Sequence, residues 1–203
     1  MSVGSPFYQR PVLVTDLMPT AFSHGAIPGF KKWCVPQPPK SNWCWAAVSK
    51  AMVGFVKSED LTLEEIARRV SVAGNISQLT QSDPFELSRA LRLLGIAHLP
   101  QVNLFRGGEQ AVITHVPQGT PIAATIAWYK PDGSVAGVYH AIAIFGWDPN
   151  KKTVLVFDPN TVGASDDIVK AVPISEMRRY LEGAESQSYG TWSAGYVVTR
   201  DAD

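Results

Sequence analysis

The residue best suited to nucleophilic chemistry is Cys44, in the stretch PQPPKSNWCWAAVSKAMV at residues 36–53. The prolines end before Ser41, and the apolar run from there to Val56 predicts a buried helix that Ser41 or Asn42 caps. A cysteine in the first turn of a helix lies near unpaired backbone N–H groups and the positive end of the helix dipole, which both lower its pKa. Cys44 is therefore a candidate nucleophile.

A thiolate nucleophile needs a general base, and histidine is the side chain suited to that role near neutral pH. Of the four histidines, His24 lies in a proline-rich arm, His98 follows a helix stop and His115 lies in a mixed segment. A structural or surface role is the more ordinary one for each of these three. His140 differs because it begins the apolar stretch HAIAIFGW, which predicts a strand. His140 is therefore the candidate base.

The strand that follows His140 in the chain ends in a carboxylate, Asp158. A hairpin that turns about residue 149 sets His140 directly opposite Asp158, with Cβ atoms about 4.5–5.5 Å apart. Asn160 lies one diagonal step away and takes the same role if the register shifts by two residues. The chain order is then that of a triad in which a thiol replaces the serine hydroxyl.

An acyl-transfer site also needs a donor for the oxyanion, and Gln37 lies seven residues before Cys44. Prolines on both sides of Gln37 restrict its backbone, so its side-chain amide can lie beside the backbone N–H of Cys44. Each of these residues taken singly has an ordinary structural explanation, because a buried cysteine or a strand histidine is usually part of the core. Their joint arrangement favours an active site.

The elements that must position these residues divide into a helical part at about 41–118 and a sheet part at about 119–203. Thr62 and Glu65 form a capping box, and Asp83, Pro84 and Glu86 begin a second surface helix, FELSRALRLL, that Gly95 ends. Strands are predicted for PIAATIAWY, VYHAIAIFGW, KTVLVFD and TWSAGYVV, with a short helix at 174–181. This order predicts an α+β fold of antiparallel sheet and helices, with a cleft between the two parts.

Composition limits the other classes of function. The chain has 203 residues of which 45% are hydrophobic, enough for one domain at 35–203, preceded by an extended arm at 1–34 that either wraps the core or is a mobile tail. Eighteen basic and eighteen acidic residues cancel, so neither nucleic acid nor an anionic membrane is an expected partner. Apolar runs are too short to cross a bilayer.

The two cysteines, Cys34 and Cys44, have neither the number nor the spacing of a disulfide framework or a structural zinc site. A bridge between them is sterically conceivable, but at least one free thiol is expected. No metal or organic cofactor is required by the chemistry described above.

These residues resemble the papain-like cysteine proteases. The likeness rests on Gln37, on Cys44 with the three residues after it at the start of a helix (CWAA), on His140 at the start of an apolar strand, and on Asp158 at the end of the next. The compact chain is most similar to the bacterial branch that contains double-glycine leader peptidases of peptide exporters and effector proteases of plant pathogens. The orienting residue is Asp, as is usual in that branch, where papain has Asn.

The resemblance implies a cysteine endopeptidase that forms a thioester acyl-enzyme, with Cys44 as nucleophile, His140 as general base and acid, Asp158 as orienter and Gln37 as oxyanion donor. Trp45 and Asn160 are candidate substrate-binding residues, and the substrate is a protein or peptide. Two alternatives stay open. The same triad serves acyl-transferring or deamidating enzymes, and the scaffold also serves modules of export systems that bind or process leader peptides.

The resemblance further implies a bacterial effector or toxin that is soluble and reaches another cell without a secretory signal peptide, which the start MSVGSPFYQR lacks. It allows an immunity or activating protein as a partner. Residues 27–33, IPGFKKW, are similar to the apolar-Pro-x-Phe-Gly-x-Trp sequence that effector proteases cleave in themselves and in host proteins. Lys31 stands where that sequence has glycine, so self-processing at this segment is an open alternative to simple packing on the core.

Overall fold

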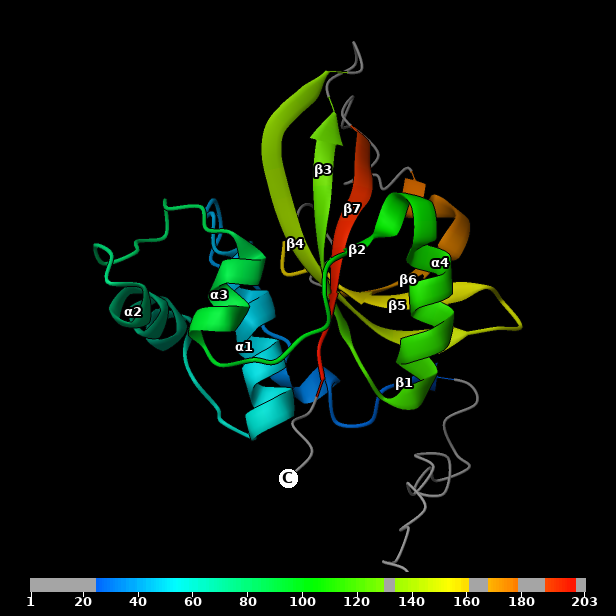
Figure 1. Cartoon of the computed structure of the whole chain (residues 1–203), viewed down its shortest axis with the longest axis horizontal. Coiled ribbons are helices and arrows are strands. Elements are labelled where there is room, and N and C mark those ends of the chain that lie inside the picture. The colour runs from blue at the N-terminus through cyan, green and yellow to red at the C-terminus, as the bar shows by residue number, and fades with distance from the viewer. Residues whose placement is uncertain (1–24, 130–133, 161–167, 179–188, 200–203) are drawn as a thin grey trace, which may run out of the picture.

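The computed structural model describes residues 25–129, 134–160, 168–178 and 189–199. Within them the fold is α+β, with helices on both sides of one antiparallel sheet (Figure 1). The described helices are α1 (Cys44–Lys57), α2 (Leu63–Gly74), α3 (Leu87–Leu93) and α4 (Leu104–His115). Short 3-10 turns lie at Lys31–Trp33, Val116–Gln118 and Ile174–Arg178. The 3-10 turn at 174–178 replaces the first part of the helix predicted for 174–181, whose remaining residues lie outside the described ranges.

The sheet has seven strands in the described residues: β1 (Gly25–Ala26), β2 (Val102–Asn103), β3 (Ile122–Tyr129), β4 (Val135–Asp148), β5 (Thr153–Phe157), β6 (Val169–Pro173) and β7 (Tyr189–Val197). Their order is β2-β7-β3-β4-β5-β6, and β1 pairs with the end of β4. The long strand β4 pairs with β3 over its first part and with β5 over its last part. Figure 1 shows the outcome, in which β5 and β6 run across the direction of β3 and β7.

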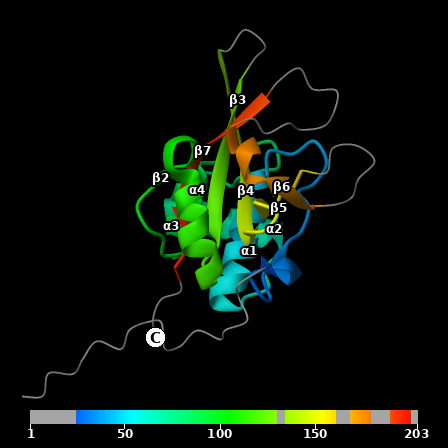
Figure 2. The ribbon, with the colours of Figure 1, turned by 90° about the vertical axis from the view of Figure 1, so that its right-hand side faces the viewer.

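The helices α1–α3 lie together on the left of the sheet in Figure 1, and α4 lies on the right, where it packs against β7. Figure 2 looks from the side of β5 and β6, with α4 near the viewer and α1 beyond the sheet. Helix α1 is buried over nearly its whole length, as its apolar sequence predicts, and it packs on β4. The predicted order of helices followed by sheet is therefore correct, except that the short strands β1 and β2 come from the N-terminal part.

Two of the predicted helix caps are wrong, although Cys44 lies in the first turn of α1 as predicted. The N-cap of α1 is Trp43 and no side chain caps it; Ser41 instead accepts a hydrogen bond from the N–H of Trp43 with its hydroxyl oxygen. Helix α3 begins at Leu87 rather than near Asp83, because the Asp83 carboxylate accepts hydrogen bonds from the backbone and hydroxyl of Thr80 and closes its own turn. The capping box of Thr62 and Glu65 is confirmed.

The predicted hairpin register is also wrong. Asp148 pairs with Thr153 and Ala143 with Phe157, and a bulge lies between Ile144 and Gly146. The turn is therefore centred further along the chain than residue 149, and His140 does not stand opposite Asp158. It pairs with Ile126 on the other neighbouring strand, β3.

The segment before α1 is part of the core where the structure describes it. Ile27 and Phe30 are buried, and the N–H of Ile27 donates to the carbonyl of Phe145 over 2.7 Å. The Phe30 ring stacks on Phe145 and tilts against Phe55, with centroids 4.9 and 5.4 Å apart. Residues 25–34 thus wrap the core, whereas residues 1–24 lie outside the described ranges.

Candidate active site

Cys44 is the first residue of α1, which places its sulfur beside backbone N–H groups that no helical turn satisfies. Tryptophans on either side hold this end of the helix in place. The indole of Trp43 donates to the carbonyl of Thr80 over 2.6 Å, and that of Trp45 donates to the carbonyl of Asp83 over 3.3 Å. The two tryptophans that bracket Cys44 in the sequence therefore fasten the helix start to the loop before α3.

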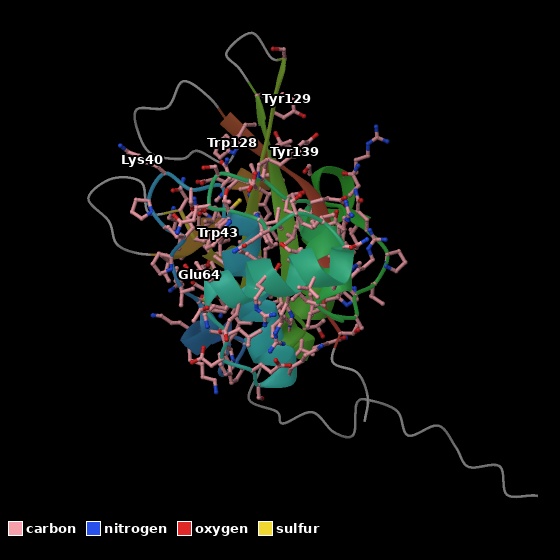
Figure 3. The ribbon with its side chains drawn as sticks, turned by 90° about the vertical axis from the view of Figure 1, so that its left-hand side faces the viewer. Lys40, Trp43, Glu64, Trp128, Tyr129 and Tyr139 are labelled. Carbon is pink, nitrogen blue, oxygen red and sulfur yellow. The ribbon has the colours of Figure 1, made fainter. Side chains whose placement is uncertain are left out.

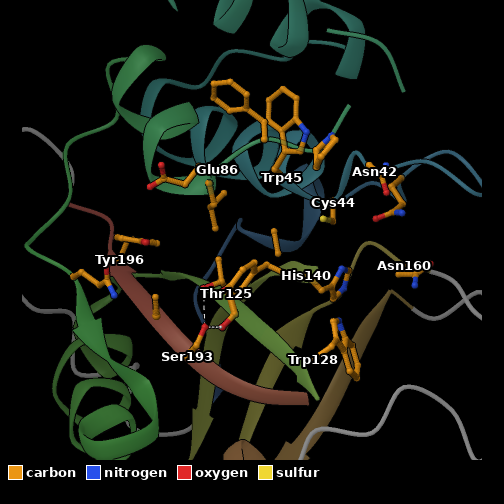
Figure 4. A pocket seen from close by; sticks show the side chains of 18 of the residues that line it. Asn42, Cys44, Trp45, Glu86, Thr125, Trp128, His140, Asn160, Ser193 and Tyr196 are labelled. Atoms are coloured by element: carbon orange, nitrogen blue, oxygen red, sulfur yellow. Dashed lines mark hydrogen bonds between the residues drawn. The ribbon is translucent and has the colours of Figure 1, made fainter. Parts of the chain in front are cut away.

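His140 bridges the thiol and a buried carboxylate. Its Nε2 lies 2.7 Å from Oδ1 of Asp158, and its ring lies near the Cys44 side chain in Figure 4. With Nε2 on the carboxylate, Nδ1 is the ring nitrogen left for the thiol. The carboxylate of Asp158 is fully buried, and the His140 side chain is 9% exposed.

The hydrogen bond between His140 and Asp158 was predicted on a wrong register, and the structure explains why it forms nevertheless. Asp158 follows the last residue of β5, where the backbone leaves the β4 ladder, and its N–H donates to the carbonyl of Ile168. The side chain reaches back to a histidine in the half of β4 that pairs with β3. The contact is therefore made beyond the end of β5 and not by direct cross-strand pairing.

The pKa values of Cys44 and His140 both shift toward charge separation. Burial alone raises the pKa of Cys44, but the hydrogen bond and charge of His140 outweigh it, with backbone donors at Ala141 and Trp45, so the pKa is lowered. Burial alone lowers the pKa of His140, but the hydrogen bonds to Asp158 and Cys44 outweigh it and raise the pKa to about 10. The arrangement favours a thiolate beside an imidazolium.

Cys34 provides the contrast. Burial raises the pKa of its thiol to about 12, with only a small opposing effect of Lys31. Both cysteines are free thiols, so the conceivable bridge between them is absent. One thiol of this chain is therefore held in a reactive environment and the other in an inert one.

Gln37 lies in the same pocket as Cys44, held there through its backbone and its side chain. Its N–H donates to the carbonyl of Pro159 over 2.9 Å, and its Nε2 donates to the carbonyl of Ser41 over 2.8 Å. One hydrogen of the Nε2 group is used in this way, and the second remains for another acceptor. The segment with Gln37 is thus tied directly to the residue after Asp158.

A pocket of about 920 Å³ surrounds these residues and takes its walls from the helical part and from the sheet (Figure 4). Trp45 and Phe85, whose ring centroids are 5.3 Å apart, lie on one side. Thr125 and Ser193, joined through their hydroxyls over 3.1 Å, lie on the other. Glu86 and Tyr196 lie at the end away from His140 in Figure 4.

The two predicted substrate-binding residues both line this pocket. Trp45 is 1% exposed, so it contributes a wall rather than a protruding contact. Asn160 donates its backbone N–H to Oδ1 of Asp158 over 3.0 Å, the oxygen that also bonds His140. Asp158 therefore contacts His140, although not through the predicted register, and the Asn160 N–H supports the carboxylate.

Several lining residues had no role in the sequence analysis. Trp128, Tyr139 and Tyr129 lie together on the β3–β4 ribbon, above the helices in Figure 3, and the first two of them line the pocket. Tyr139 is 60% exposed although it is large and aromatic. Its position next to His140 was not a signal, because adjacent side chains of a strand point to opposite faces of the sheet.

No metal site is evident in the parts of the chain that the structure describes, because no three His, Cys, Asp or Glu side chains group there as ligands for an ion. The three other histidines lie apart from the Cys44 pocket or outside the described residues. His98 forms an isolated bridge to Val198, His115 ends α4, and His24 is not described. Among the described helices, none has the length and apolar character needed to span a membrane.

Comparison with known proteins supplies one match. Residues 31–170, more than half of the chain, match the sequence model of a family described as "Papain-like cysteine protease AvrRpt2". A search of curated proteins found no match to the chain. The matched range covers Gln37, Cys44, His140 and Asp158.

Proposed function

The chain belongs to the papain-like cysteine protease family of AvrRpt2, and we propose that it is an endopeptidase in which Cys44, His140 and Asp158 carry the reaction. Membership of the family makes it a cysteine peptidase with a protein substrate. The observation that carries the assignment of residues is that His140, in the same pocket as Cys44, holds its Nε2 2.7 Å from Oδ1 of the fully buried Asp158. That pocket is large enough for a peptide.

In the proposed reaction the Cys44 thiolate attacks the carbonyl carbon of a peptide bond, forming a C–S bond and an oxyanion. The backbone N–H of Cys44 and the second Nε2 hydrogen of Gln37 are the donors available to that oxyanion. The C–N bond then breaks, and the imidazolium of His140 gives its proton to the leaving amine. Water, deprotonated by the neutral His140, hydrolyses the thioester and restores the thiol.

The role of Asp158 in this proposal is to hold the ring of His140 with Nδ1 toward sulfur and to stabilise the imidazolium. Three features support it: the carboxylate is fully buried, its Oδ1 is 2.7 Å from Nε2, and the Asn160 N–H fixes that same oxygen. A buried carboxylate so held has little freedom to turn away from the histidine.

The test of this proposal uses the two cysteines of one molecule. We expect an epoxide inhibitor of papain-type thiolates to capture Cys44 rapidly and Cys34 not at all, because only the pKa of Cys44 is lowered. Since a group with a lowered pKa stays deprotonated to lower pH, labelling of Cys44 by iodoacetamide should persist to about pH 5, where a thiol with a pKa near 8.5 is protonated. Adducts are mapped by mass spectrometry.

A His140→Ala variant is the matched control, since it keeps Cys44 at the helix start but removes the partner. It should lose epoxide capture and shift iodoacetamide labelling to alkaline pH. Equal and slow labelling of both cysteines in the unmodified protein would refute the proposal. A peptide library then identifies the product: cleaved peptide means hydrolysis, whereas a mass change of about one dalton without cleavage means deamidation by the same thioester.

The proposed setting is that of a bacterial effector or toxin delivered into another cell, where it cleaves a protein. The resemblance to plant-pathogen effector proteases supports this part. Comparing new protein N-termini in host cells that express the chain and its Cys44→Ala variant tests it. New N-termini that depend on Cys44 would support the proposal, and identical N-termini in both would count against it.

A further inference from the structure

A lysine contacts the side of Asp158 that faces away from His140. The Nζ of Lys170 lies 3.1 Å from Oδ2 of Asp158, while His140 and the Asn160 N–H occupy Oδ1. The Lys170 side chain is 38% exposed, and the carboxylate is fully buried. The described structure thus gives this carboxylate donors from β4, from the loop after β5 and from β6.

The fold explains why Lys170 reaches Asp158. Strand β6 is the edge strand beside β5, and Lys170 pairs with Val156, two residues before Asp158. A residue and its diagonal neighbour on the next strand share a face of the sheet, within reach of a long side chain. The aliphatic part of lysine can cover that face while the ammonium group stays partly in water.

We propose that Lys170 is a positioning residue of the active site, which fixes the plane of the Asp158 carboxylate and limits how strongly that carboxylate stabilises the protonated His140. This rests on the function proposed above. By holding Oδ2, Lys170 keeps Oδ1 directed at Nε2 of His140. By its charge, it offsets part of the carboxylate charge that the imidazolium experiences.

The electrostatic part follows from the order of the groups. Among the described residues, the titratable groups that face His140 are Cys44 from α1 and Asp158 after β5, and Lys170 from β6 faces the far oxygen of Asp158. Among the effects that raise the pKa of His140, the hydrogen bond to Asp158 is the largest, followed by the effect of Cys44. An imidazolium that is stabilised too far holds its proton too tightly to serve as the acid for the leaving amine. A cation behind the carboxylate opposes this.

An ordinary structural ion pair would also place a lysine here, so the experiment must separate the two roles. Loss of Lys170 leaves a buried carboxylate with one donor fewer, and lower stability follows in either case. Only the positioning role also predicts a change in the titration of His140. Lys170→Met removes both the charge and the hydrogen bond. Lys170→Gln removes the charge alone, and Lys170→Arg keeps both.

The measurement is an NMR titration of the histidine ring signals in the full chain, in which His140→Ala assigns one of four histidines. We expect the midpoint of His140 to rise by about 0.5–1 pH unit in Lys170→Met and Lys170→Gln, because a partly exposed cation near the carboxylate is lost. Lys170→Arg should keep the original midpoint. Lys151→Met is the matched control, because it removes a lysine that also faces a carboxylate, Asp148 at 3.9 Å, but in the turn between β4 and β5. It should leave the midpoint of His140 unchanged.

A second readout is the rate of epoxide capture at Cys44, expected to fall about 3- to 10-fold in Lys170→Met, as for the loss of one hydrogen bond of ordinary net strength. An unmoved His140 midpoint in folded Lys170→Gln, or one that Lys170→Arg also raises, would overturn the proposal. If Lys170→Met does not fold, the pair of Gln and Arg variants decides. Failure of the proposed function shows separately, as a Cys44 that lacks low-pH reactivity in the unmodified protein.

Discussion

Replacing Phe30 with alanine tests how firmly residues 25–34 belong to the core. Phe30 is fully buried, and it contacts two aromatic rings, stacked on Phe145 at 4.9 Å and tilted against Phe55 at 5.4 Å. Full burial of a phenylalanine contributes about 1.5–3 kcal/mol, and each aromatic pair adds about 0.5–1.5 kcal/mol. With the cavity that remains, the free energy of unfolding should fall by about 3–5 kcal/mol in Phe30→Ala.

The assay is urea unfolding followed by tryptophan fluorescence, with the slope of the transition compared between variants. Tyr139→Ala is the matched control, because it also truncates an aromatic side chain but one that is 60% exposed. The control should change the free energy of unfolding by about 0.5 kcal/mol or less. A loss below about 1 kcal/mol in Phe30→Ala would refute the reasoning, since it would mean that the segment contributes little to the folded state.

The same burial bears on self-processing at residues 27–33. A protease cleft binds an extended and accessible chain, whereas Ile27 and Phe30 are buried and the Ile27 N–H is bonded to Phe145. We therefore expect the folded protein to stay uncut at this segment over hours, and Phe30→Ala to become the more susceptible form. Sequencing the N-terminus after incubation checks this, with Cys44→Ala as the inactive control. A cut between residues 27 and 33 in the folded, unmodified protein would contradict it.

The remaining predictions concern charge and close packing. Asp158→Asn should lower the pKa of His140 by about one unit or more in the NMR titration, because the carboxylate that stabilises the imidazolium is gone; an unmoved midpoint would count against the assigned role. Gly54→Ala should cost about 1–3 kcal/mol in urea unfolding, since its Cβ would overlap the Trp33 ring. Gly107→Ala in α4 has open space and should stabilise by about 0.5–1 kcal/mol; equal effects of the two substitutions would contradict this view of packing.

The sequence by itself determined the chemistry of the candidate site. Residue types and their neighbours were enough to select Cys44, His140 and Asp158, because a thiol at a helix start, a histidine in an apolar strand and a carboxylate at a strand end are local features. The helices α1 and α2 and the strands β3, β4, β5 and β7 were predicted for the same reason. Hydrophobic periodicity is a property of a short segment.

The tertiary structure decided the register, the caps and the supporting contacts. The turn is centred beyond residue 149 and β5 ends at Phe157, so the ladder between β4 and β5 stops without setting His140 opposite Asp158. The Asp83 carboxylate, expected to cap α3, instead accepts a hydrogen bond from the N–H of Thr80. Neither outcome can be read from a segment alone, because each depends on groups that other elements bring near.

Lys170 shows most clearly what cannot be predicted from the sequence. Its strand, VKAVP, is short and lies at an edge, and a lysine at such a position ordinarily protects the edge from pairing. Only the pairing of β5 with β6 sets Lys170 on the same face as Asp158, 12 residues away in the chain. The sequence determines which groups can react or carry charge, but the distances between groups on different strands, and hence their pKa values, exist only once the sheet has formed.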